Sequence, residues 1–189
     1  QLGYAPRAPV KVGYVSQWMG DRGPLDLSAL EGRPFHLVPA RGGEIAFSGK
    51  VKRRTPRTHL DSAVPKDVPH QNWSNADVCE CDFSSFGQPG EYVLAVEGLG
   101  CSYPFRIHED VYRDAFYVTC RGLYHHRAGI ELKQPHTTWE RKADTHEGHI
   151  SHPVWGWYHD AGDWDGYGSH SIVPRYLLLA FELAPRNFS

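Results

Sequence analysis

Glu91-Tyr-Val-Leu-Ala-Val-Glu97 alternates with a period of two, so that Tyr92, Leu94 and Val96 share one face. Such alternation is typical of a strand that packs one face on a core. Similar runs, rich in Val, Tyr, Phe and Leu, recur over residues 1 to about 108 and are separated by turn signals. The runs are Val10–Val15, Phe35–Val38, Val78–Phe83, Tyr92–Val96 and Tyr103–Ile107. Several short antiparallel strands in one such segment predict an all-β, immunoglobulin-like sandwich over residues 1–108.

Two features inside this first segment leave alternatives open. The stretch Lys50–Asn75 is rich in charge, Pro and Asn, and we expect a long surface connection with one weak strand. Cys79 and Cys81 lie two residues apart on a predicted strand and point the same way. That spacing disfavours a bond between them, so one of them pairs with Cys101 or both are free and buried.

The apolar period changes after Ile107, which predicts an all-α segment over residues 109–189. Asp110 is a plausible N-cap for a helix from Val111 to about Arg127. One face of that helix carries an apolar stripe of Tyr112, Phe116, Cys120 and Leu123. Residues 130–153 have no periodicity and predict an extended loop.

A second helix is expected from about Ser171 to Leu183, with Pro185 closing it. Its sequence is apolar on nearly all sides, and a helix of that kind is buried by neighbours on several faces. Nothing later in the sequence supplies those neighbours. We therefore expect this chain to fold against another polypeptide or to be a piece of a larger enzyme.

Composition excludes some classes of partner. The net charge is −2 and no basic run is present, which argues against nucleic acid and against an anionic membrane surface. No apolar stretch reaches the ~20 residues that cross a bilayer. Aromatic residues make up 13 % of the chain and gather late in the sequence. Such rings pack on the faces of sugars or fill a core.

The most unusual stretch is Trp155-Gly-Trp-Tyr-His-Asp-Ala-Gly-Asp-Trp-Asp-Gly-Tyr167. It places three carboxylates among five aromatic rings just before a buried helix. Glycosidases need a carboxylate that binds a water on one side of a sugar ring and a proton donor on the other side. A solvated acidic loop is the competing interpretation. A calcium loop of EF-hand type fails, since Ala161 and Ile172 would occupy its first and last ligand positions.

Five stretches, in order, resemble glycoside hydrolase family 9. Gly156-Trp-Tyr-His-Asp-Ala-Gly-Asp163 is similar to its G-W-(Y/H)-D-A-G-D signature. Gln1-Leu-Gly-Tyr-Ala-Pro-Arg-Ala-Pro-Val-Lys11 resembles the opening of the immunoglobulin-like domain that often precedes the catalytic barrel. The other three are Cys81-Asp-Phe-Ser-Ser-Phe with Pro89-Gly-Glu-Tyr-Val93, Ser102-Tyr-Pro-Phe-Arg-Ile107, and Leu123-Tyr-His-His-Arg-Ala-Gly129. The resemblance implies a sandwich followed by the opening helices of an (α/α)6 barrel.

The resemblance also implies site residues and an activity. Asp163 would be the general base that activates water, and Asp160 would hold that water and keep Asp163 ionised. Residues near the sugar would be Trp157, Tyr158, His159, Trp164 and Tyr167. The implied enzyme is an inverting glycosidase acting on β-1,4-linked glucan. Exo-acting relatives on glucosamine-containing oligosaccharides give an alternative substrate, and a non-catalytic carbohydrate-binding protein is the alternative function.

Departures from the family pattern limit what is carried over. Ala128 stands where many relatives have a zinc-ligating Cys, so no metal site is predicted, although a structural calcium ion stays open. His136, His146, His149 and His152 are read as solvated loop residues rather than ligands. The family's catalytic acid is a late barrel Glu, which this sequence lacks, and Glu182 lies outside any matching motif. We therefore expect the chain alone to be inactive, the rest of the barrel to be its partner, and the protein to be secreted or periplasmic.

Overall fold

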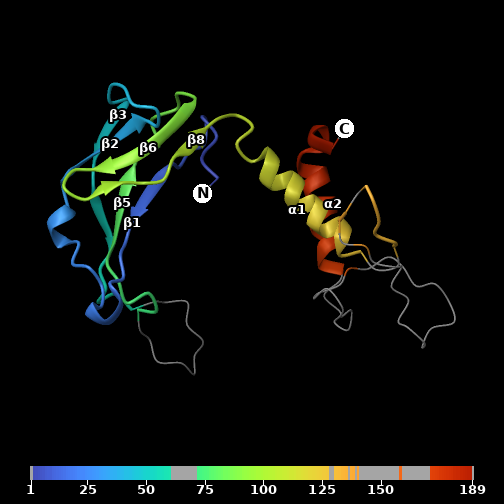
Figure 1. Ribbon diagram of the computed structural model, residues 1–189, viewed down its shortest axis with the longest axis horizontal. Helices are drawn as coiled ribbons and strands as arrows, with labels where there is room; N and C mark the ends of the chain where they lie inside the picture. The colour runs from blue at the N-terminus through green and yellow to red at the C-terminus, as the bar shows by residue number, and fades with distance from the viewer. Residues whose placement is uncertain are drawn as a thin grey trace. The chain divides into compact units, whose positions relative to one another are not determined.

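A computed structural model describes residues 2–60, 72–127, 130–135, 137–138, 140, 158 and 171–188. The chain divides into two compact units, Gln1–Arg113 and Asp114–Ser189. The first is a sandwich of β-strands and the second contains two α-helices (Figure 1). No helix among the described residues has the length and apolar character needed to cross a membrane.

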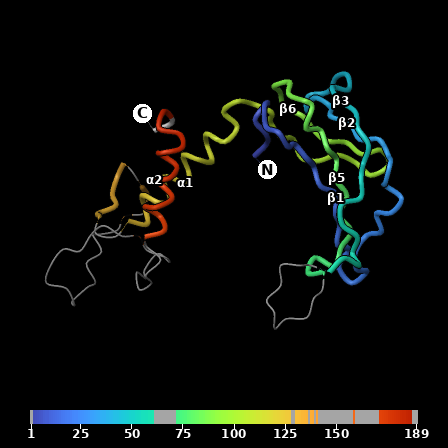
Figure 2. The backbone as a smooth tube through the Cα atoms, turned by 180° about the vertical axis from the view of Figure 1, so that it is seen from behind, coloured from blue at the N-terminus to red at the C-terminus, as the bar shows by residue number. Residues whose placement is uncertain are grey.

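Two antiparallel sheets build the sandwich. The first has the order β1-β5-β4 and consists of Val12–Val15, Val78–Asp82 and Lys52–Thr55. The second has the order β3-β2-β6-β7, with β8 also paired to β6. Its strands are Phe47–Lys50, Pro34–Pro39, Gly90–Val96, Gly100–Cys101 and Phe105–Ile107. Seen from behind, β1 and β5 run side by side (Figure 2), as their register from Val12↔Asp82 to Val15↔Cys79 requires.

The alternation in the sequence produces the core between the sheets. Tyr92, Leu94 and Val96 of β6 are buried, whereas Val93 and Ala95 between them are only half-buried, which confirms the predicted face. They pack with buried side chains from both sheets, among them Phe35, Leu37, Cys79, Cys81, Phe83, Phe105 and Ile107. Six aromatic rings form four edge-to-face or tilted pairs around this core, among them Tyr4 and Phe83 at a centroid distance of 5.2 Å.

A lysine side chain lies in the interior of the sandwich, against the usual preference of lysine for water. Lys11 is 1 % exposed. Its ammonium group donates hydrogen bonds to the carbonyl oxygens of Pro6 at 3.1 Å and Ala8 at 2.8 Å, and its backbone N–H donates to Ser84 at 3.0 Å. These bonds offset the cost of burying the charge. Lys11 therefore fixes the N-terminal loop to the sandwich.

The cysteines are free, as the second of the two alternatives predicts. Cys79 and Cys81 are buried on β5, Cys101 is exposed on β7, and Cys120 is half-buried. The connection expected over Lys50–Asn75 contains a strand, β4, and its residues 61–71 lie outside the described part of the chain.

The helices are close to the predicted positions. α1 spans Arg113–His125 and α2 spans Ile172–Leu183, followed by a short 3-10 helix, η4, over Pro185–Phe188. α1 begins two residues later than expected, and Asp110 is not its N-cap. The Asp110 carboxylate instead accepts a hydrogen bond from the His108 ring, and its backbone oxygen accepts from the Arg113 N–H at 2.9 Å.

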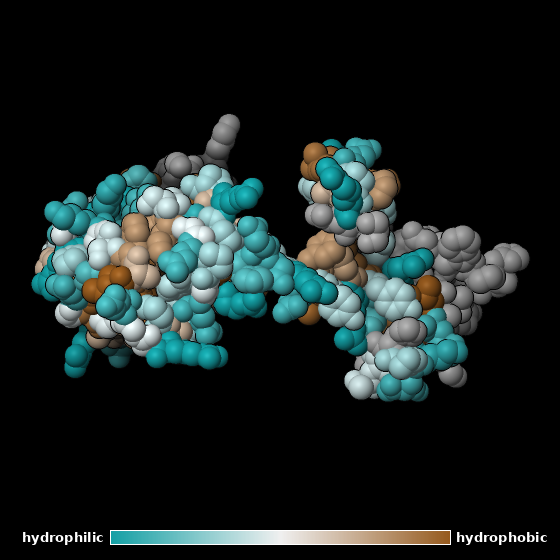
Figure 3. All heavy atoms as spheres, turned by 90° about the horizontal axis from the view of Figure 1, so that it is seen from above, coloured by the Kyte–Doolittle hydropathy of each residue, from teal (hydrophilic) through white to brown (hydrophobic). Residues whose placement is uncertain are grey.

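Neither helix buries a side chain. Phe116 of the predicted stripe on α1 is 47 % exposed, and Leu178 and Phe181 of α2 are 64 % and 51 % exposed. Apolar side chains accordingly reach the surface of the helical unit (Figure 3). The sequence pattern predicts buried helices, whereas these apolar side chains are about half exposed or more.

Candidate functional site

The residues predicted to carry the chemistry fall mostly outside the described residues. These are Trp157, His159, Asp160, Asp163, Trp164 and Tyr167. Their assignment as catalytic and sugar-binding residues stays a prediction. Tyr158 alone of the predicted set belongs to the described part, where it is half-buried.

Tyr158 ties the predicted loop to the first helix. It forms an isolated antiparallel β-bridge with Arg127, two residues after the end of α1. Asp160 follows Tyr158 by two residues in the sequence, and Asp163 by five. The bridge thus joins two of the five stretches that carry the family resemblance. Sequence periodicity gave no signal for this contact, because a single bridge between loops has no repeating pattern.

A hollow of about 520 Å³ lies along the C-terminal half of α1. It is lined by Tyr117, Cys120, Arg121, Tyr124, His125 and Pro135. Residues 117, 121 and 124 lie on one face of the helix, since they are four and three positions apart. Phenol rings interleaved with nitrogen donors suit a ligand that has both apolar faces and hydroxyl groups.

His126 directly follows His125, which lines this hollow, and one of its ring nitrogens is buried. Its Nδ1 is shielded from solvent and has no hydrogen-bond partner among the residues that the structure describes. A buried ring nitrogen of this kind costs free energy unless a donor or acceptor reaches it. Arg127, which follows His126 directly, forms the bridge to Tyr158.

No metal centre is found among the described residues. No cluster of three or more His, Cys, Asp or Glu in that part of the chain has a geometry that fits an ion. His136, His146, His149 and His152 lie outside it, so the interpretation of these four as solvated residues stays a prediction.

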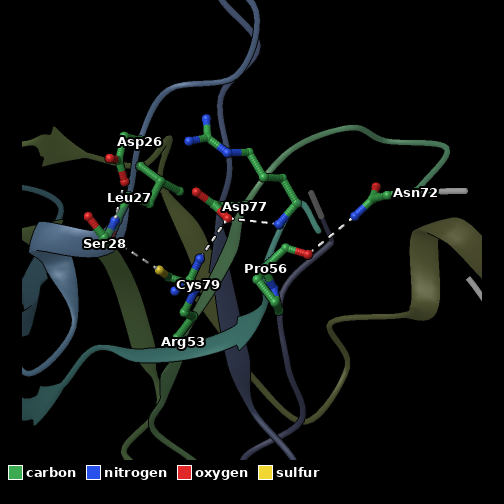
Figure 4. A network of polar contacts seen from close by, with 9 residues as sticks. Asp26, Leu27, Ser28, Arg53, Pro56, Asn72, Asp77 and Cys79 are labelled. Atoms are coloured by element: carbon green, nitrogen blue, oxygen red, sulfur yellow. Dashed lines mark hydrogen bonds and ion pairs between the residues drawn. The ribbon is translucent and has the colours of Figure 1, made fainter. Parts of the chain in front are cut away.

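The most buried carboxylate of the sandwich, Asp77, serves the structure rather than a reaction (Figure 4). Its Oδ1 accepts hydrogen bonds from the Arg57 N–H at 2.8 Å and the Arg53 guanidinium at 3.1 Å. Burial by itself raises the pKa of Asp77, but these two partners outweigh burial and hold the pKa below its ordinary value. Because its Oδ1 already accepts from two donors and its lowered pKa makes it a weaker base, Asp77 is poorly suited to take a proton from a ligand. No sequence pattern indicated it, because Asp77 lies between the connection predicted over Lys50–Asn75 and the strand predicted from Val78.

The two buried thiols of the sandwich are also expected to be unreactive at neutral pH. Burial, with the neighbouring Cys79 and Glu80 adding to it, raises the pKa of Cys81 to about 12. Burial likewise raises the pKa of Cys79. Both groups therefore stay protonated at neutral pH, and the thiol form is a poor nucleophile and a poor metal ligand.

Comparison with known proteins gives the sandwich a family. Residues 1–101 match the family model described as the cellulase N-terminal ig-like domain. Endoglucanase D from Acetivibrio thermocellus is 33 % identical over 114 residues, which cover 53 % of this chain and 18 % of that protein. The chain thus spans under a fifth of the length of this curated relative.

Solved structures extend the similarity to the helices. A metagenome-derived glycoside hydrolase family 9 endoglucanase superposes with a TM-score of 0.70 and 25 % identity, covering 98 % of this chain and 33 % of its own. The family 9 endoglucanase J30 gives a TM-score of 0.64 over 93 % of this chain and 30 % of its own, and at 22 % identity it supports the fold alone. The family model accounts for 101 of the 189 residues, and this chain therefore belongs to the family of cellulase N-terminal immunoglobulin-like domains, as its resemblance to family 9 glycoside hydrolases implied.

Proposed function

We propose that this chain is the N-terminal portion of a glycoside hydrolase that cleaves β-1,4-linked glucan with inversion. The observation that carries the proposal is the similarity to a family 9 endoglucanase over 98 % of this chain, helices included. A match to the sandwich alone would fit any protein that uses this domain. Because the similarity continues through α1 and α2, it favours an enzyme over a separate carbohydrate-binding module.

The proposed reaction places the attacking water on Asp163. This carboxylate takes a proton from the water as the oxygen attacks the anomeric carbon, and Asp160 accepts a second hydrogen bond from the same water. Attack on the face opposite the leaving group inverts the configuration in one displacement. The leaving oxygen needs a proton from an acid on the other side, which we assign to a Glu in the remaining barrel. Carboxylates and water suffice for this step, so we propose no catalytic cofactor.

The helices support the view that further chain completes the barrel. Leu178, Phe181 and Leu183 of α2 are each more than half exposed, as are Tyr117 and Val118 of α1. We propose that the remaining helices of an (α/α)6 barrel cover these side chains, with residues 1–108 as the sandwich and 109–189 as the start of the catalytic domain. The bridge between Arg127 and Tyr158 would hold the base loop at the end of α1.

The proposed substrate follows the relatives, which are named endoglucanases. We therefore favour internal cleavage of a β-1,4-glucan over exo-cleavage of glucosamine-containing oligosaccharides. Polysaccharides of this kind are not taken up whole by cells, so the proposed location is secreted or periplasmic.

A pair of carboxylate variants in the complete enzyme tests the assignment. Asp163→Asn removes the base and should lower kcat on cellohexaose by roughly a hundredfold to ten-thousandfold while leaving substrate affinity in place. The matched control is Asp165→Asn, two residues away and outside the D-A-G-D motif, which should turn over near the parent rate. Equal losses in both variants, or near-normal turnover in Asp163→Asn, would reject the role of Asp163. Release of reducing sugar by the 189-residue chain alone would contradict an acid supplied from outside it.

A further inference from the structure

An aromatic depression lies along one edge of the sandwich, and its lining includes none of the residues assigned to catalysis. It consists of two hollows of about 260 Å³ and 200 Å³. Both are lined by Tyr14 of β1, Leu94 of β6 and Ser102, so they are adjoining parts of one depression. Leu99 and Ser16 border the larger part, and Tyr103 borders the smaller one. We call this depression the edge groove.

The rim of the edge groove is aromatic and accessible. Tyr103 is 86 % exposed, the highest value among the large apolar side chains of the described residues, and Tyr14 is 58 % exposed. The Arg54 guanidinium lies over the Tyr14 ring at 5.2 Å from the centroid, which steadies the ring from one side. Beneath the rim the floor is closed, because Leu94 fits against β1 so closely that a Cβ added at Gly13 would come within 2.6 Å of it.

The edge groove also offers free backbone groups. The Phe83 N–H donates to the Lys11 oxygen, so Lys11 and the alternate residue Gly13 face β5. Tyr14 therefore directs its N–H and C=O toward the opposite edge, where no described strand pairs with β1. The next outward group, the Val12 oxygen, is already bonded by the Tyr4 hydroxyl.

These properties select the kind of ligand. The Arg54 guanidinium at the rim lies against the Tyr14 ring, and no charged side chain lines either hollow, so the hollows themselves favour a neutral ligand over an ionic one. An extended peptide added to β1 would need several successive backbone groups that are free to bond. The Val12 oxygen, the next such group after those of Tyr14, already accepts a hydrogen bond from the Tyr4 hydroxyl. A glycan needs flat aromatic faces for its rings and a few donors and acceptors for its hydroxyls, which the groove supplies.

We infer that the edge groove is a glycan-binding site on the sandwich, which holds a β-1,4-linked glucan chain against Tyr14 and Tyr103. The choice of β-1,4-glucan rests on the function proposed above. The site itself stands on residues of the sandwich alone. Its role is to keep the polysaccharide on the protein independently of the catalytic loop.

Titration of the ¹⁵N-labelled 189-residue chain with cellohexaose tests the inference. Amide shifts are expected at Tyr14, Ser102 and Tyr103. Tyr103→Ala should weaken the binding reported by Tyr14 and Ser102 by roughly tenfold, since one exposed ring contact is lost and no core packing changes. Trp18→Ala is the matched control, because Trp18 is an aromatic side chain of the same unit, 50 % exposed and outside the edge groove. It should leave the titration unchanged.

Three outcomes would overturn the inference. The first is that cellohexaose shifts only amides outside the edge groove. The second is that Tyr103→Ala binds cellohexaose with unchanged affinity. The third is that an uncharged Val-Thr hexapeptide shifts the groove amides and cellohexaose does not. Asp163→Asn separates this site from the proposed function. Shifts at Ser102 that persist in this variant support the edge groove whatever happens to hydrolysis, whereas a hydrolytic complete enzyme without these shifts would refute the edge groove alone.

Discussion

The sandwich buries its large apolar side chains, whereas the helical unit exposes many of its own. In the sandwich, Phe35, Leu37 and Ile107 are completely withdrawn from solvent, whereas Leu178 on α2 is 64 % exposed. The sandwich thus encloses its own core between two sheets. α2 carries a strongly apolar sequence, yet none of the described side chains of α1 or α2 is buried. The difference indicates that the first unit is a complete folding unit and that the second is suited to a larger assembly.

The largest expected difference is between the rates at which the exposed and the buried cysteines of the sandwich react. Iodoacetamide should modify the exposed Cys101 rapidly, whereas Cys79 and Cys81 should react only when the sandwich opens. For a domain of ordinary stability, the rates should differ by at least about a thousandfold. Mass spectrometry of the native chain after timed labelling measures them, with labelling in denaturant as the control. Similar rates at the three cysteines would show that the sandwich is not closed.

Truncation of one side chain in each unit tests the contrast directly. Phe35→Ala empties a fully buried site and should lower the free energy of unfolding of the sandwich by about 3–5 kcal/mol. Leu178→Ala removes an exposed side chain and should change it by less than about 0.5 kcal/mol. Hydrogen exchange at the Leu37 amide reports on the sandwich in both variants. The comparison fails if Leu178→Ala is as costly as Phe35→Ala.

A smaller effect is expected from the ion pair between the buried Asp77 and Arg53. Asp77→Asn removes the charge that Arg53 and the Arg57 N–H stabilise and should cost about 2 kcal/mol. The exposed Asp21→Asn is the control and should be close to neutral.

The same variant has a pH signature. Because the pKa of Asp77 is lowered in the folded state, its contribution is fully present above the unfolded pKa near 4 and is lost as pH falls through the folded pKa. Below about pH 4, the parent should therefore lose its advantage over Asp77→Asn. An advantage that persists at lower pH would contradict the ionised state of Asp77.

Periodic features of the fold were predictable from sequence, and single contacts were not. Alternation located Tyr92, Leu94 and Val96 on the buried face, and apolar content located α2 within one residue at each end. β3 was missed because Phe47-Ser-Gly-Lys50 has weak strand propensity and is held by its pairing with β2. The interior position of Lys11 depends on two carbonyl oxygens brought together by the folded loop, which no local pattern encodes.

The candidate site shows the same division. The D-A-G-D stretch stood out because carboxylates among many rings are unusual in a solvated loop, and the resemblance then assigned roles to Asp160 and Asp163. Neither composition nor spacing could indicate that Arg127 and Tyr158 meet. The edge groove was hidden for a similar reason, since Tyr14 and Ser102 come from strands and loops that are far apart in the sequence.

The outer strand β4 has a consequence for how this protein behaves at high concentration. It forms the border of its sheet and carries Lys52, Arg53 and Arg54 in succession, with Arg54 paired to Glu80 at 3.0 Å. Two molecules that approach border to border there would bring their cations together. This like-charge repulsion disfavours the continuous intermolecular sheets from which amyloid fibres grow.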